Sequence, residues 1–82
     1  MEFIMYPTTV KLLAVEIKSV CDEYLSRKIS EEHLKKLVFH YAGSCPEMLF
    51  NGSVLNPTII NRIGKKRSNL LNKILAGYQL SL

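Results

Sequence analysis

The stretch TTVKLLAVEIKSVCDEYL, residues 8–25, decides the fold class, because its apolar side chains recur every three or four positions. The apolar positions are Val10, Leu13, Ala14, Ile17, Val20, Cys21, Tyr24 and Leu25. This spacing places them on one stripe of an α-helix that can be buried. Thr8 or Thr9 can cap the helix, since a threonine hydroxyl accepts a hydrogen bond from a free backbone N–H of the first turn. We therefore predict a helix over 9–27.

A second helix is predicted over 31–42, because Ser30 is a candidate N-cap. Serine is a favoured N-cap, and Glu31 and Glu32 suit the positive end of the helix dipole. Gly43 is expected to end this helix in a left-handed conformation.

The charges on both helices are spaced so that they can neutralise one another. Opposite charges four positions apart on a helix attract. Four such pairs occur here, namely Lys18 with Asp22, Glu23 with Arg27, Glu31 with Lys35, and Glu32 with Lys36. These two helices are expected to form a scaffold.

The remaining sequence completes an all-α fold. Residues 1–7 end in a proline and predict an extended arm, and residues 44–52 predict a connector with at most one helical turn. Asn56-Pro57 is a cap followed by proline at the first helical position, which predicts a helical stretch over 57–76 that ends at Gly77. The 82 residues thus predict one domain, a compact bundle of three to four helices.

The composition also raises the possibility of a homodimer. Hydrophobic residues make up 48% of the chain, which is apolar for a small helical monomer. A partner could cover the excess, and a second copy is the simplest partner. The alternative function is therefore a protein-interaction module, either homo-oligomeric or of the adaptor type, whose expected face contains Phe3, Ile4, Met5, Tyr78 and Leu80.

The net charge of +4 is unevenly distributed. Residues 1–45 hold six lysines and arginines and six acids, whereas residues 46–82 hold five cations and a single acid, Glu47. The whole positive excess therefore lies in the second part of the chain.

The cations of the last stretch gather on one side if it forms a single helix. Arg62, Lys65, Lys66, Asn69 and Lys73 fall within an arc of about 100°, opposite the apolar side chains. Since residues 57–76 include no acid, these cations face water, another part of the fold or a polyanion. The function predicted from them is non-enzymatic contact with a nucleic acid or another polyanion.

Two residues of this stretch leave alternatives open. Gly64 either lies within one helix or separates two shorter ones. In a continuous helix, Arg67 lies among core residues and needs a carboxylate or several carbonyl groups as partners. If the helix breaks at Gly64, Arg67 lies in a first turn and can extend its charge to solvent.

Two more specific binding modes fit the sequence less well. A DNA-reading helix-turn-helix usually has a small residue where this chain has Ile60 and an apolar residue where it has Lys65. An amphipathic helix lying on anionic lipid is the other mode, but the helical stretch has no Trp or Phe.

The sequence predicts no catalytic site, metal site or cofactor. Cys21, His33, His40 and Cys45 lack the short spacings of metal ligands, and a Cys45–His40 nucleophile pair has no accompanying motif. Two reduced cysteines and the absence of a signal peptide or a spanning segment predict a cytoplasmic protein.

Three segments resemble a small family of uncharacterised bacterial proteins of about this length. They are TVKLLAVEIKSV (9–20), ISEEHL (29–34) and NPTIINRIGKKRSNLLNKIL (56–75). The segment Gly64-Lys65-Lys66-Arg67 is the most specific part of the resemblance. That family has no assigned activity, cofactor or catalytic residue, so the resemblance implies no function.

Overall fold

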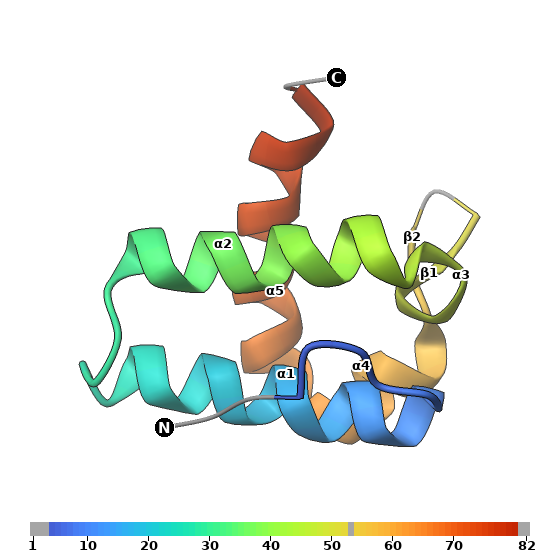
Figure 1. Ribbon diagram of the computed structural model, residues 1–82, viewed down its shortest axis with the longest axis horizontal. Coiled ribbons are helices and arrows are strands. Elements are labelled where there is room, and N and C mark those ends of the chain that lie inside the picture. Colours follow the sequence, from blue (N-terminus) through green and yellow to red (C-terminus); the bar gives the residue numbers. More distant parts are fainter. Residues whose placement is uncertain (1–3, 53, 81–82) are drawn as a thin grey trace.

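The first two helices of the computed structural model form a hairpin of antiparallel helices (Figure 1). The structure describes the backbone of residues 4–52 and 54–80. Its elements are α1 (Val10–Leu25), α2 (Glu31–Ser44), α3 (Pro46–Leu49), β1 (Phe50–Asn51), β2 (Val54–Leu55), α4 (Pro57–Ile63) and α5 (Lys65–Leu80). The predicted all-α fold class is confirmed, with one small hairpin of strands added.

Both scaffold helices begin at capped ends. The hydroxyl of Thr9 accepts a hydrogen bond from the N–H of Leu12 at 3.1 Å, and the hydroxyl of Ser30 accepts one from the N–H of His33 at 3.1 Å. Each cap satisfies a backbone donor that has no partner within its helix.

α1 ends in a motif that normally uses glycine. The N–H of Lys28 donates to the carbonyl of Glu23 at 2.8 Å, and the N–H of Arg27 donates to that of Tyr24 at 3.0 Å. This pair of bonds is the Schellman arrangement, which requires a left-handed residue after the helix. Arg27 occupies that position with φ of 63°.

A short connector turns the chain from α2 to α4. Pro46 takes the first position of α3, and β1 pairs with β2 across a turn at Gly52, where φ is 68°. The side chain of Asn56 donates to the carbonyl of Met48 at 3.0 Å and accepts from the N–H of Thr58 at 2.9 Å. Asn56 therefore caps α4 and also fastens α3 to it.

The last helical stretch is two helices. Gly64 has φ of 86° and ψ of 167°, a conformation outside the helical region, and it separates α4 from α5. α4 packs on α1, while α5 turns away and crosses behind α1 and α2, so that its carboxyl end extends beyond α2 (Figure 1). A single helix over 57–76 is therefore not formed.

Three predicted helix ends are wrong. α1 ends at Leu25 rather than at residue 27, because Arg27 adopts a left-handed conformation with φ of 63°. α2 continues through Gly43 to Ser44, because the break comes at Cys45, the residue before Pro46, where the proline ring disfavours helical geometry. α5 continues through Gly77 to Leu80, and Gly77 is not among the residues with positive φ. Glycine within a helix costs about 1 kcal/mol relative to alanine but does not by itself end it.

The core lies where the five described helices meet. Every helix contributes buried apolar side chains, and Leu13, Leu34, Leu49, Ile59 and Leu71 are fully buried. The Cα radius of gyration is 11.4 Å, close to the ~12 Å expected for a compact domain of this length. The chain thus forms one core despite the extended end of α5.

Candidate polyanion-binding surface

The five residues predicted to contact a polyanion are all exposed, and they come from two helices. Arg62 lies in the last turn of α4, whereas Lys65, Lys66, Asn69 and Lys73 belong to α5. On α5 their separations of three and four residues keep them on one side. We call these five residues the basic surface.

No acid of α4 or α5 opposes the basic surface, because neither helix contains Asp or Glu. Within residues 4–52 and 54–80, no ion pair joins any of its cations to a carboxylate. Lys65 and Lys66 also occupy the first turn of α5, where the helix dipole is positive. At the beginning of α5 the positive potential therefore comes both from the lysine side chains and from the helix dipole.

Arg67 differs from its neighbours because its charge is neutralised. Its Nε donates to Oδ1 of Asp22 at 2.7 Å, and its Nη2 donates to Oδ2 at 3.1 Å. Its Nη1 donates to the carbonyl of Ile63 at 3.0 Å. The hydrogen bond to Asp22 raises the pKa of Arg67 above its usual value.

The position of Arg67 combines the two alternatives left open by the sequence. The helix does break at Gly64 and Arg67 lies in the first turn of α5, yet its side chain is 30% exposed and bound to a carboxylate. Ser68 follows it into the core, where its buried hydroxyl donates to the carbonyl of Gly64 at 2.7 Å. Arg67 thus fixes the beginning of α5 and leaves polyanion contact to its neighbours.

The scaffold charges pair differently from the prediction. Glu31 and Lys35 form the expected pair, with 3.8 Å between Oε2 and Nζ. Asp22 binds Arg67 in place of Lys18, and Glu23 lies 3.8 Å from Lys28. These changes arise because α5 and the turn after α1 bring other cations to the same carboxylates.

The described part of the N-terminal arm is held over the scaffold by three hydrogen bonds. The N–H of Ile4 donates to Oε1 of Glu16 at 2.7 Å, Tyr41 donates to the carbonyl of Ile4 at 2.7 Å, and Nε2 of His40 lies 2.6 Å from the carbonyl oxygen of Met5. The ring of Tyr6 packs edge-on against His40 with 5.1 Å between centroids. Phe3 and the side chains of Tyr78 and Leu80, also predicted for an apolar face, lie outside the described residues.

The cysteines are buried and poor nucleophiles. Burial and the nearby Asp22 raise the pKa of Cys21 to about 11, and burial raises the pKa of Cys45. The Sγ of Cys45 donates to the carbonyl of Tyr41 at 3.3 Å, while His40 faces the arm and Ser44. In the described ranges no three His, Cys, Asp or Glu side chains form a group that could hold a metal ion.

A family model described as a conserved hypothetical protein matches residues 4–76. The chain belongs to this family. The match covers α1 to α4 and most of α5, so the resemblance to a family without assigned activity is confirmed. No curated protein and no solved structure matches the chain.

The described helices also limit how this chain can meet a membrane. Within residues 4–52 and 54–80, none of them combines the length and the hydropathy that crossing a bilayer requires.

Proposed function

We propose that this protein binds a polyanion, with nucleic acid as the first candidate, through the basic surface. The observation that carries the proposal is that Arg62, Lys65, Lys66 and Lys73 are exposed on two helices without a single acid. Clustered cations of this kind release counterions when they contact phosphates, which drives binding without regard to base sequence. Asn69, between Lys66 and Lys73 on α5, adds an uncharged donor and acceptor.

The proposal describes a binding protein rather than an enzyme. The raised pKa values of Cys21 and Cys45 keep both thiols protonated at neutral pH, and a protonated thiol is a weak nucleophile. Buried free thiols also suit a reducing compartment, which supports a cytoplasmic setting.

Salt dependence of binding to duplex DNA is the direct test. If three to five phosphates are contacted, the logarithm of the association constant should fall with the logarithm of salt concentration at a slope of about −3 to −4.5. Fluorescence anisotropy with a labelled duplex, measured from low to physiological ionic strength, gives this slope.

A matched pair of double variants separates the basic surface from net charge. Replacing Lys65 and Lys66 by Gln should weaken binding and reduce the slope by about 2. Replacing Lys35 and Lys36 of α2 by Gln removes the same charge from another exposed helix face and should change binding much less. Equal effects of the two double variants, or no salt-sensitive binding at low ionic strength, would sink the proposal.

Self-association is the second candidate, favoured by the arm. Ile4, Met5 and Tyr6 are 47%, 38% and 73% exposed, respectively, so three consecutive large side chains leave apolar surface in contact with water. Because hydrogen bonds already fix the arm, presenting this surface to a second copy would cost little ordering entropy. Sedimentation equilibrium should then give a dimer that Tyr6→Lys weakens, whereas a monomer at high concentration would remove this candidate.

A further inference from the structure

A surface pocket lies where α1 packs on α4, and it shares Arg62 with the basic surface. Lys18 of α1 and Arg62 of α4 line it, together with Ala14 and Val15 of α1. The pocket thus brings together two cations from helices that are far apart in the sequence. Neither of the other two lining side chains carries a charge or a hydrogen-bonding group.

Lys18 has no carboxylate partner in the described part of the chain. Asp22, one turn further along α1, has both carboxylate oxygens bound to Arg67. Glu16 directs Oε1 to the N–H of Ile4. The acids of α1 closest in sequence to Lys18 therefore bind other groups, and no described ion pair includes Lys18 or Arg62.

Two cations that face one pocket repel each other, and an anion between them removes that repulsion. The negative end of the α4 dipole stabilises the charge of Arg62, but it does not stabilise the charge of Lys18 on α1. The two apolar residues that line the pocket, Ala14 and Val15, offer no internal counterion. An incoming anion could therefore meet both cations at once, with the planar guanidinium of Arg62 forming paired hydrogen bonds and the ammonium of Lys18 acting as a point charge.

We propose that this pocket binds one phosphate group, so that Lys18 extends the polyanion-binding surface from α5 across α4 to α1. The inference rests on the proposed function, since the phosphate is taken to belong to the backbone of a bound nucleic acid. Only Ile63 and Gly64 separate Arg62, which lines the pocket, from Lys65, the first cation of α5. A phosphodiester backbone bound along this line would contact three helices.

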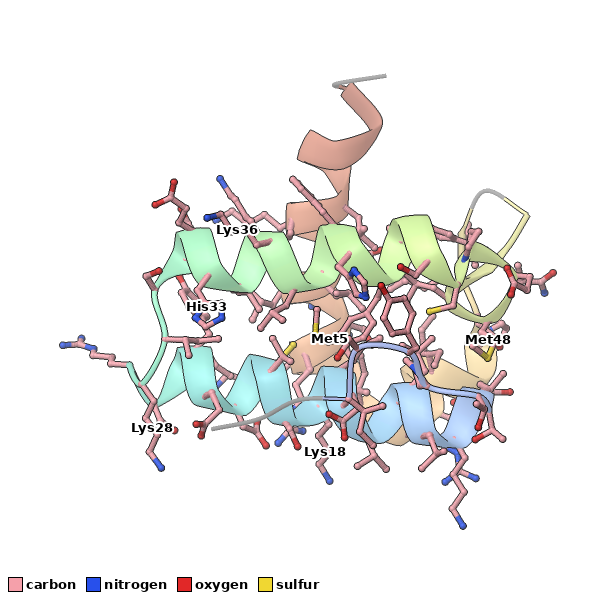
Figure 2. The ribbon with its side chains drawn as sticks, viewed as in Figure 1. Met5, Lys18, Lys28, His33, Lys36 and Met48 are labelled. Carbon is pink, nitrogen blue, oxygen red and sulfur yellow. The ribbon has the colours of Figure 1, made fainter. Side chains whose placement is uncertain are left out.

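Binding of a duplex DNA of mixed sequence by two single variants tests the pocket. Lys18→Ala should weaken binding at 50 mM salt by roughly five- to tenfold and reduce the salt slope by about 0.9, the contribution of one phosphate contact. Lys36→Ala is the control, because Lys36 is exposed on α2 and points away from α1, at the edge of the hairpin opposite to Lys18 (Figure 2). It should change the affinity less than about twofold.

Arg62→Gln provides an independent variant on the other side of the pocket. Because the two side chains contact the same phosphate, the double variant should lose less affinity than the product of the two single losses. Losses that multiply fully would contradict a shared phosphate.

A second measurement separates failure of the pocket from failure of the proposed function. Inorganic phosphate added to the free protein should shift the backbone amide resonances of residues 14–18 and 62 in NMR spectra, and Lys18→Ala should abolish the shift. DNA binding that is equally sensitive to Lys18→Ala and Lys36→Ala would overturn the pocket and leave the proposed function standing. Saturable phosphate shifts without any DNA binding would support the pocket as a site for free phosphate and overturn the proposed function, whereas neither response would overturn both.

Discussion

Arg67 binds both carboxylate oxygens of Asp22, a residue 45 positions earlier in the chain. The same guanidinium donates to the carbonyl of Ile63 at the end of α4. One side chain therefore joins α1, α4 and α5 at the point where the chain changes direction. Planar paired bonding of this kind is specific to arginine, because the ammonium of lysine has no matching fork of donors.

Loss of this pair should lower stability while the fold is retained. Asp22→Asn removes the negative charge, and Arg67→Lys removes the paired hydrogen-bond geometry. Both variants should therefore have a lower melting temperature. The pair is partly exposed, so the loss of stability should be smaller than that caused by Leu71→Ala. Leu71 is fully buried, and its truncation to alanine is expected to cost about 2–5 kcal/mol. Thermal unfolding followed by circular dichroism measures all three variants.

A double-mutant cycle shows whether the two residues act together. If they do, the variant with both substitutions should be more stable than the sum of the single effects predicts. Additive effects would mean that the ion pair contributes nothing to stability. Asp22→Asn should also strengthen DNA binding slightly, since it releases the charge of Arg67 beside the basic surface.

Local signals in the sequence predicted the beginnings of the helices well. Thr9, Ser30 and Asn56 each cap a helix through their own side chains, and Pro46 and Pro57 occupy first helical positions. These features depend only on residues within one turn, so they are readable without knowledge of the fold.

Features that depend on distant residues were harder to predict. The partner of Arg67 lies on another helix, and no spacing in the sequence indicates Asp22. Because Asp22 binds Arg67, Lys18 does not form the ion pair with Asp22 that its spacing on α1 predicts. Glycines were ambiguous for another reason: Gly64 breaks the helical stretch, while Gly43 and Gly77 remain helical, and tertiary packing decides between these outcomes.

Gly64→Ala should destabilise the protein through the backbone alone. The φ and ψ of Gly64, 86° and 167°, lie in a region that L-residues strongly disfavour, whereas a Cβ added there would meet no atom within 4 Å. The expected cost is about 1–3 kcal/mol, measurable by urea unfolding.

D-alanine at position 64 is the control for this interpretation. The same φ and ψ are favourable for a D-residue, so a chemically synthesised protein with D-alanine there should be as stable as the parent or more stable. Equal destabilisation by both isomers would mean that the positive φ of Gly64 is not the cause.

Arg27→Gly should stabilise the protein. Arg27 adopts φ of 63° at the left-handed position of the turn after α1, where glycine avoids the strain of a side chain. The expected gain is about 0.5–1 kcal/mol in the free energy of unfolding. Arg27→Ala removes the same charge but keeps the strained Cβ, so it should give no gain; a similar increase from both variants would point to charge rather than backbone strain.

Stability should decrease as the pH rises from about 9 to 11, because burial and the nearby Asp22 raise the pKa of Cys21 from 9.0 to about 11 in the folded protein. Below pH 9 the thiol of Cys21 is protonated in both the folded and the unfolded protein, so its full contribution to stability is present. Between pH 9 and 11 the thiol ionises in the unfolded protein but not yet in the folded one, which lowers the free energy of unfolding by up to about 2 kcal/mol. Burial likewise raises the pKa of Tyr41 from 10.0 to about 12, which continues the loss at higher pH. Urea unfolding under reducing conditions at pH 8, 9, 10 and 11 measures the decrease. Cys21→Ala should lower stability at pH 8 but flatten its dependence between pH 9 and 11, and an unchanged slope in that variant would mean that the thiol is not the titrating group.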